Sequence, residues 1–279
     1  MPDVSVQHLL TYYRSSSNLE LTSFDGHNWS TPVHIAVTGL NGTPSFRADP
    51  TITMYANVGG LLKIATSADG EVWSTFTDTG VEIDDTPAAV VGSDGQVWTF
   101  FRRGDALWFA TQAGGTFEAK QVSNVDISCA PSPVLYRGTL YVFHQGKEAD
   151  GWLWCSRYAN GSWQPDAKLT QVGMSQSPAA VIYDDQLYVF HQGRDKDGWL
   201  WYSLFNGKTW EIDVKVPKAG MSGSPSPIVF AHQLFVLHQG RSNNHELWCA
   251  EYLTDHWLPD TQIDLVSIDD GPTTALGSS

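Results

Sequence analysis

The stretch AAVIYDDQLYVFHQGRDKDGWLWYSLFNGKTW, residues 179–210, contains the repeating unit that decides the fold of this 279-residue chain. Closely similar segments end at Trp163 and Trp257. The final aromatic position recurs at intervals of 44 to 47 residues, at Trp29, Trp73, Phe117, Trp163, Trp210 and Trp257. A proline opens each unit at similar intervals, at Pro44, Pro87, Pro131, Pro178, Pro225 and Pro272. Because both markers give the same count, the sequence contains six copies of one unit.

Each unit is predicted to form four short strands. In the quoted copy these are AAVIYDD, QLYVFHQ, GWLWYSLF and the following WEIDVKV, which are rich in β-branched and aromatic residues. Asp-Gly or Asn-Gly pairs precede the marker aromatic in four copies, at residues 25–26, 69–70, 160–161 and 206–207, where a two-residue hairpin turn requires positive φ. The sequence therefore predicts an all-β fold, a six-bladed β-propeller of four-stranded antiparallel blades, as a single domain over residues 1–279.

The two ends of the chain are predicted to share one blade. The C-terminal GPTTALGSS, residues 271–279, aligns with the first strand of a unit, whereas the N-terminus begins at the second strand, HLLTYYRSS. Pairing the N- and C-terminal strands in one blade closes the ring, because it removes an open sheet edge.

Composition limits the classes of partner. Apolar residues make up 42% and charged residues 16% of the chain, which indicates a packed globular protein. The net charge of -14 argues against nucleic acid and anionic membranes. The start, MPDVSVQHLL, has no signal-peptide pattern, and no long apolar run follows, so we expect no membrane insertion and a soluble protein, cytoplasmic or released by a non-standard route. Association into a homo-oligomer stays open.

The candidate binding residues follow from strand alternation. Loops joining strands two and three, and loops joining strand four to the next unit, must emerge on the same face. In the last three units these loops combine amide, imidazole, hydroxyl and indole groups, which suit the hydroxyls and the apolar C–H face of a sugar. The predicted ligand-binding residues are His144, Gln145, Trp152, Trp154, Ser175, Ser177, His191, Gln192, Trp199, Trp201, Ser222, Ser224, His238, Gln239 and Trp248.

Core packing and turn chemistry are the competing explanation for these repeated positions. We assign the marker aromatics to structure on this ground. The first three units lack the His-Gln pair and have Tyr13-Arg14, Ala56-Asn57 and Phe101-Arg102 there. We therefore predict three similar sugar sites in the second half of the chain. Each site binds weakly alone, and simultaneous binding at several sites raises the overall affinity.

The segment LYVFHQGRDKDGWLWYSLFNGKTW, followed by VPKAGMSGSPS, resembles the repeats of bacterial and fungal propeller lectins of the Photorhabdus and Psathyrella lectin type, and units carried by some insecticidal toxins. The resemblance is strong over residues 126–260. In the first 120 residues it is limited to the repeated prolines, turns and Trp positions. It implies binding of fucose or related sugars in pockets between blades. Those lectins usually have seven blades, whereas this sequence contains six units. The six-bladed fungal fucose lectins match the count, but their repeat motifs are not found here.

Other functions have weaker signals. The chain contains no HExxH, Walker or GxGxxG motif, so we predict that it is not an enzyme, although Asp84-Asp85 and Asp269-Asp270 offer the paired carboxylates of a glycosidase. Asp195-Lys-Asp197-Gly198 is only a fragment of a calcium loop, and Cys129, Cys155 and Cys249 form no CxxC pair. We expect three reduced thiols, no metal and no cofactor. A protein-interaction scaffold is the main alternative to a lectin.

Overall fold

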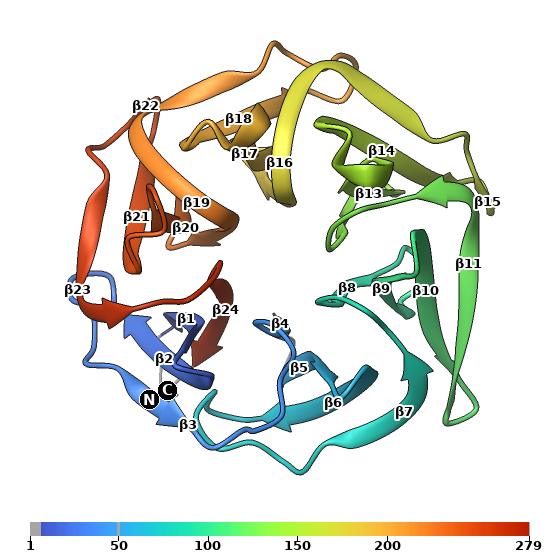
Figure 1. The fold of residues 1–279 in the computed structure, drawn as a ribbon, viewed down its shortest axis with the longest axis horizontal. Helices are drawn as coiled ribbons and strands as arrows, with labels where there is room; N and C mark the ends of the chain where they lie inside the picture. The colour runs from blue at the N-terminus through green and yellow to red at the C-terminus, as the bar shows by residue number, and fades with distance from the viewer. Residues whose placement is uncertain (1–6, 49–50, 279) are drawn as a thin grey trace, which may run out of the picture.

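The structure is a computed structural model that describes residues 7–48 and 51–278, so the predicted domain ends and the first six residues of the chain lie outside the described part. Six blades surround a central opening, with the first strand of each nearest the centre and the fourth at the outer rim (Figure 1). The predicted all-β fold of six four-stranded antiparallel blades is confirmed. No helix in the described ranges is long and apolar enough to cross a membrane.

Blades I to III are separate four-stranded sheets. Blade I consists of β24 (Thr273–Ser278), β1 (Gln7–Ser15), β2 (Asn18–Phe24) and β3 (Val33–Ile35). Blade II consists of β4 (Ser45–Ala48), β5 (Ile52–Val58), β6 (Leu61–Ser67) and β7 (Thr77–Glu82). Blade III consists of β8 (Ala88–Val91), β9 (Val97–Arg103), β10 (Ala106–Ala113) and β11 (Thr116–Asp126).

In blades IV to VI, two long strands are shared between neighbours. Blade IV consists of β12 (Ser132–Tyr136), β13 (Thr139–Gln145), β14 (Trp152–Ala159), β15 (Ser162–Trp163) and the first part of β16 (Ala167–Tyr183). Blade V consists of the rest of β16, β17 (Gln186–Gly193), β18 (Trp199–Phe205) and the first part of β19 (Val214–Phe230). Blade VI consists of the rest of β19, β20 (Gln233–Gly240), β21 (Glu246–Leu253), β22 (His256–Trp257) and β23 (Thr261–Ser267).

The hydrophobic core is divided into six clusters, one at each junction between blades. Phe190 and Val236, for example, join blades V and VI. Each cluster includes or packs against one marker aromatic, in ring order Trp29, Trp73, Phe117, Trp163, Trp210 and Trp257. The structural assignment of these aromatics is therefore confirmed, and because each blade contributes half of two clusters, a single blade has no complete core.

Most of the marker prolines lie near the ring centre, and the terminal strands pair with each other. Five of the six marker prolines line a central cavity of about 420 Å³. The C-terminal strand β24 pairs with β1, from Gln7 opposite Ser278 to Tyr12 opposite Thr273, so the two terminal strands share blade I (Figure 1).

Candidate functional site

The loops expected on one face do lie together. The backbone N–H of Lys196, in the β17–β18 loop, donates to the hydroxyl of Ser175 on the connection entering blade V, at 3.0 Å. Asn243 makes the same 3.0 Å contact with Ser222 one blade later. Both serines are buried, so their hydroxyls fix loop conformation.

The three predicted histidines are fully buried, each with 0% exposure. In blade V, Nδ1 of His191 lies 3.0 Å from the carbonyl of Gln192, and Nε2 lies 3.1 Å from Asp213. His144 and His238 repeat this geometry with Asp166 and Asp260, each at 3.2 Å. Because both ring nitrogens face protein acceptors and no surface is exposed, these imidazoles join the strands of one blade and have no atom that faces solvent.

The glutamine that follows each histidine joins its blade to the next connection. The side-chain amides of Gln145, Gln192 and Gln239 donate to the carbonyls of Met174, Met221 and Ile268, at 3.2, 3.0 and 3.1 Å. All three glutamines are at least 95% buried, since their exposures are 5%, 3% and 2%. They hold the connections in place at the loop-bearing face.

The two tryptophans of the repeated GWLW motif have different surroundings. Trp152 is covered by two cations, because Lys168 Nζ lies 4.0 Å and the Arg194 guanidinium 4.5 Å from its ring centroid. Trp199 has the same pair one blade later, with Lys215 at 4.4 Å and Arg241 at 4.5 Å. Each arginine comes from the following blade, so these rings form cation–π contacts between blades.

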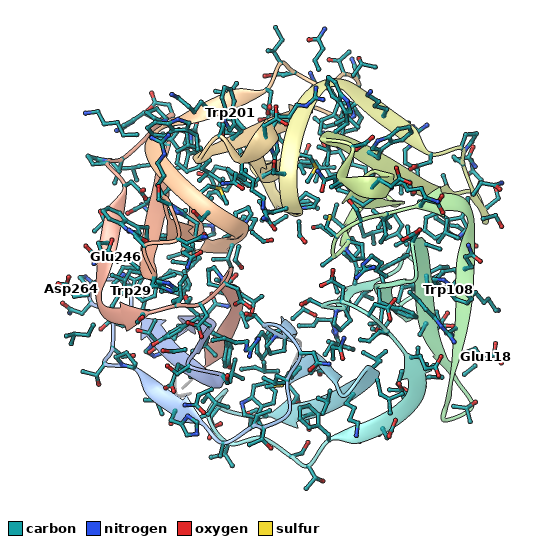
Figure 2. The ribbon with its side chains drawn as sticks, viewed as in Figure 1. Trp29, Trp108, Glu118, Trp201, Glu246 and Asp264 are labelled. Carbon is teal, nitrogen blue, oxygen red and sulfur yellow. The ribbon has the colours of Figure 1, made fainter. Side chains whose placement is uncertain are left out.

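Trp154, Trp201 and Trp248 are half-buried, and a neighbouring carboxylate fixes the orientation of each indole. The indole N–H of Trp154 donates to Asp150 at 2.9 Å, and that of Trp201 donates to Asp197 at 2.8 Å. Trp248 donates instead to Glu246 at 3.2 Å. A side chain at Gly146 would lie 2.5 Å from the Asp150 carboxylate, which explains the glycine of the HQG motif. Trp201 lies toward the outer rim of the ring (Figure 2).

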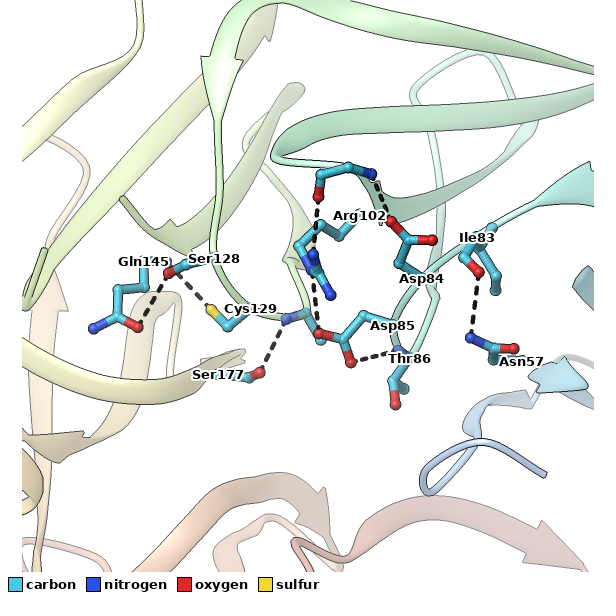
Figure 3. Close-up of polar contacts among 12 residues, drawn as sticks. Asn57, Ile83, Asp84, Asp85, Thr86, Arg102, Ser128, Cys129, Gln145 and Ser177 are labelled. Atoms are coloured by element: carbon cyan, nitrogen blue, oxygen red, sulfur yellow. Dashed lines mark hydrogen bonds and ion pairs between the residues drawn. The ribbon is translucent and has the colours of Figure 1, made fainter. Parts of the chain in front are cut away.

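Ser177 and Ser224 belong to the centre of the ring. Ser177 accepts a hydrogen bond from the backbone N–H of Ala130 at 3.1 Å (Figure 3), and Ser224 accepts one from Ser177 at 3.2 Å. Both serines line the central cavity. The structure therefore separates these serines from Trp154, so the serines and tryptophans predicted together do not line one common pocket.

Trp154 lines a cavity of about 680 Å³ between blades III and IV, which we call the rim groove. Asn124 and Asp126 of β11 form one wall, and Lys147 and Gln164 of blade IV also line it. Lys147 Nζ lies 3.3 Å from Asp126 Oδ2, and this hydrogen bond raises the pKa of the lysine. The groove combines an oriented indole with an amide, a carboxylate and an ammonium group.

The paired aspartates contact other protein groups, and Asp85 and Asp270 both line the central cavity. Asp84 accepts a hydrogen bond from the Gly104 N–H at 2.6 Å, and Asp85 lies 3.6 Å from Arg102 (Figure 3). Asp270 accepts from the Thr43 hydroxyl at 2.5 Å, and burial raises the pKa of its carboxyl group. Each of these carboxylates has its own protein partner. Among the described residues, no group of three His, Cys, Asp or Glu side chains is placed to hold a metal ion, and all three cysteines are buried free thiols.

Sequence reasoning missed the partners of the predicted residues. Asp166, Asp213 and Asp260 lie 22 residues after their histidines, and this constant spacing was the available signal. Arg194 and Arg241 each lie 42 residues after Trp152 and Trp199, but this constant spacing alone does not indicate a contact that crosses between blades. Asn124, which lines the rim groove, lies in a unit that lacks the His-Gln motif.

The chain is similar in fold to several solved structures. No protein-family model matches it, and no curated protein sequence matches it. The six-bladed fungal lectin from Aleuria aurantia is 13% identical, with a TM-score of 0.64 over 95% of this chain and 93% of that one. AofleA from Arthrobotrys oligospora is 11% identical, with a TM-score of 0.69 over 97% and 85%. A chain of a nidogen/laminin complex is 11% identical, with a TM-score of 0.63 over 96% and 98%. At these identities the likeness is one of fold, and the chain has the six-bladed β-propeller architecture of the Aleuria lectin.

Proposed function

We propose that this chain is a carbohydrate-binding lectin that acts as a single domain without catalysis, and that the rim groove at Trp154 is one of its sugar sites. The observation that carries the proposal is the half-buried indole of Trp154, which is oriented by Asp150 and lies in a groove with the amide of Asn124 and the carboxylate of Asp126. An apolar sugar face packs on such a ring, while its hydroxyls bond to the amide and carboxylate.

Fucose or a related sugar is the proposed ligand class. The structural neighbours support it, because a solved Aleuria aurantia structure is described as a fucose-specific lectin. Trp201 and Trp248 occupy the equivalent positions of blades V and VI, with the same type of indole-to-carboxylate bond. We therefore keep these three tryptophans as ligand contacts and assign the buried histidines, the buried serines and the amide N–H groups of the glutamines to the support of the loops around them.

A glycan-array screen of the purified protein, with competition by free fucose, galactose and methylated sugars, tests the function. We expect binding that free sugar abolishes. A clean negative with folded protein contradicts the lectin proposal. It would favour a protein-interaction scaffold, the second candidate, which is supported by the fold likeness to a chain of the nidogen/laminin complex.

Substitutions in the rim groove test the site. Trp154→Ala removes the stacking surface, and we expect at least a tenfold, or roughly 1.4 kcal/mol, loss of sugar affinity at that groove by calorimetry. Asn124→Gly removes only the amide, because Asn124 has a φ of 59° and Gly80, at the same position of blade II, has 70°. Lys218→Gly is the matched control, since Lys218 has a φ of 61° and does not line the groove. Equal affinity in all three variants would exclude this groove.

A further inference from the structure

A separate polar cavity of about 330 Å³ lies between blades V and VI on the loop-bearing face. Gln192 and Lys196 of blade V line it, together with Ser222 on the connection and Arg241 and Asn243 of blade VI. None of these residues lines the rim groove between blades III and IV. The volume is within the range of roughly 300–1,000 Å³ that is usual for small-molecule sites.

Gln192 provides an unused hydrogen-bond acceptor at this cavity. The residue is 3% exposed, and its amide N–H donates to the carbonyl of Met221 at 3.0 Å. Its buried Oε1 has no hydrogen-bond donor among the described residues. Turning the amide over would place Oε1 against the Met221 carbonyl, so the orientation is fixed by the hydrogen-bond pattern.

The equivalent glutamine in blade IV has the donor that Gln192 lacks. Gln145 Oε1 accepts from the hydroxyl of Ser128 at 3.3 Å (Figure 3). Ser175 stands at the Ser128 position of blade V, where its hydroxyl accepts from the Lys196 backbone N–H at 3.0 Å and makes no hydrogen bond to Gln192 Oε1. An unpaired buried acceptor is costly, so the Gln192 oxygen favours a ligand that presents an O–H group.

The charges at the cavity favour an anion. Lys196 and Arg241 are both lining residues, although the chain as a whole has a net charge of -14. The carboxylate among the lining residues, Asp197, has both oxygens occupied, by the Trp199 N–H at 3.0 Å and the Trp201 indole at 2.8 Å. Arg241 uses one nitrogen on the Asp197 carbonyl at 3.3 Å. Since a guanidinium carries five donors, several stay available for an anion.

We infer that this cavity is a second binding site, for a polyhydroxylated carboxylate of the size of one uronic acid sugar. The carboxylate bonds to Lys196 and Arg241, and a hydroxyl of the same molecule donates to Gln192 Oε1. A neutral sugar offers the two cations no anionic partner, and a simple anion leaves the buried acceptor unpaired. The inference goes beyond the proposed lectin activity of the rim groove and does not depend on it.

Titration of the whole protein with sodium D-glucuronate, at low and constant ionic strength, tests the site. We expect saturable binding by ligand-observed NMR and calorimetry. D-Glucose lacks the charge and acetate lacks the hydroxyl groups, so each should bind at least about tenfold more weakly, which corresponds to the loss of one good charged or buried hydrogen bond.

Paired variants locate the site. Gln192→Met and its control Gln145→Met each lose the same amide-to-connection hydrogen bond, so both lower stability, but only Gln192→Met should reduce glucuronate affinity, by about tenfold. Lys196→Ala keeps the backbone, because Ala149 has a φ of 52° where Lys196 has 54°, and it should weaken binding while Lys208→Ala does not.

Three results would overturn the inference: no saturable glucuronate binding, equal binding of glucuronate and glucose or of glucuronate and acetate, or equal losses in Gln192→Met and Gln145→Met. Trp154→Ala separates this site from the rim groove. It should abolish neutral sugar binding at the groove and leave the glucuronate affinity unchanged.

Discussion

The histidines of the repeated motif show how one side chain type can have a structural role at every copy. His191 donates or accepts at both ring nitrogens, toward the Gln192 carbonyl and the Asp213 carboxylate, and its side chain has no exposed surface. The Ser203 hydroxyl also donates to Asp213, at 3.1 Å. Three groups from one blade are therefore satisfied by one another, and removing one leaves a buried polar atom unpaired.

His191→Leu tests this assignment. The variant leaves the Asp213 carboxylate without one partner, so we expect the free energy of unfolding to fall by about 2–3 kcal/mol in urea titrations. Sugar affinity at the rim groove should not change, because His191 lies in blade V. Trp154→Ala should lose sugar binding, and its fall in stability should come from the half-buried indole and its bond to Asp150 and not from the histidine cluster. A loss of sugar binding in folded His191→Leu would show that the histidine contributes to sugar binding.

Residues of the same type differ here in ways that sequence does not distinguish. Trp152 and Trp154 are two positions apart. Two cations lie over the ring of Trp152, whereas Trp154 lines the rim groove. The sequence predicted that both belong to the loop-bearing part of the blade. It could not predict that Arg194, from the next blade, covers one ring, because that contact depends on how the blades are rotated in the ring.

At the level of elements, the loop between the second and third strands connects neighbouring blades. Arg194 passes over Gly151 and Gly173, where an added Cβ would lie within 3.0 Å of its side chain. Arg241 makes the same approach to Gly198, at 2.6 Å. At the junction of blades III and IV, Lys147 instead pairs with Asp126 at 3.3 Å and Asp105 at 3.7 Å. Lys147, Arg194 and Arg241 therefore place a cation at the same position of all three junctions, but the groups that these cations contact differ.

The C-terminal strand is the element with the clearest predicted effect on stability. Ala275 of β24 is buried, Thr273 donates to the Pro44 carbonyl at 2.7 Å, and Thr274 lies 2.9 Å from Ser226. The strand therefore contacts its own blade I and both neighbouring blades. Deleting residues 271–279 should lower Tm by about 10 °C or more, because it removes several contacts and exposes a sheet edge.

Adding the peptide GPTTALGSS to the truncated chain provides the control for this deletion. Donor-strand pairing should restore part of the lost Tm in a concentration-dependent way. A scrambled peptide of the same composition should not. An unchanged Tm in the truncated chain would show that β24 does not hold the ring together.

For the whole molecule, the fold was predictable because the repeats determine it. The marker aromatics and prolines gave six units, and the structure places the aromatics in six junction clusters and five prolines at the central cavity. The site was less predictable. Ser177 and the rim-groove residue Trp154 are only 23 positions apart, but one lines the ring centre and the other the rim. Sequence repeats give the number of junctions, whereas the contacts across each junction require the three-dimensional structure.

Repetition around a rigid ring predicts multivalent binding. Trp154, Trp201 and Trp248 lie in three successive blades, so several weak sites can engage one glycan-coated surface together. We expect the apparent affinity for a densely fucosylated surface to exceed that for free fucose by roughly 10²- to 10⁴-fold in surface plasmon resonance. The double variant Trp201→Ala/Trp248→Ala should lose most of this gain. A gain that persists in the double variant would require sites elsewhere on the ring.

The most direct test of the account is a crystal structure of the protein soaked in L-fucose at a concentration that saturates binding in solution. The account predicts the sugar in the rim groove between blades III and IV, with its apolar face on Trp154 and a hydroxyl near Asn124. Fucose bound only elsewhere, such as in the central cavity, or no bound fucose at that concentration, would contradict it.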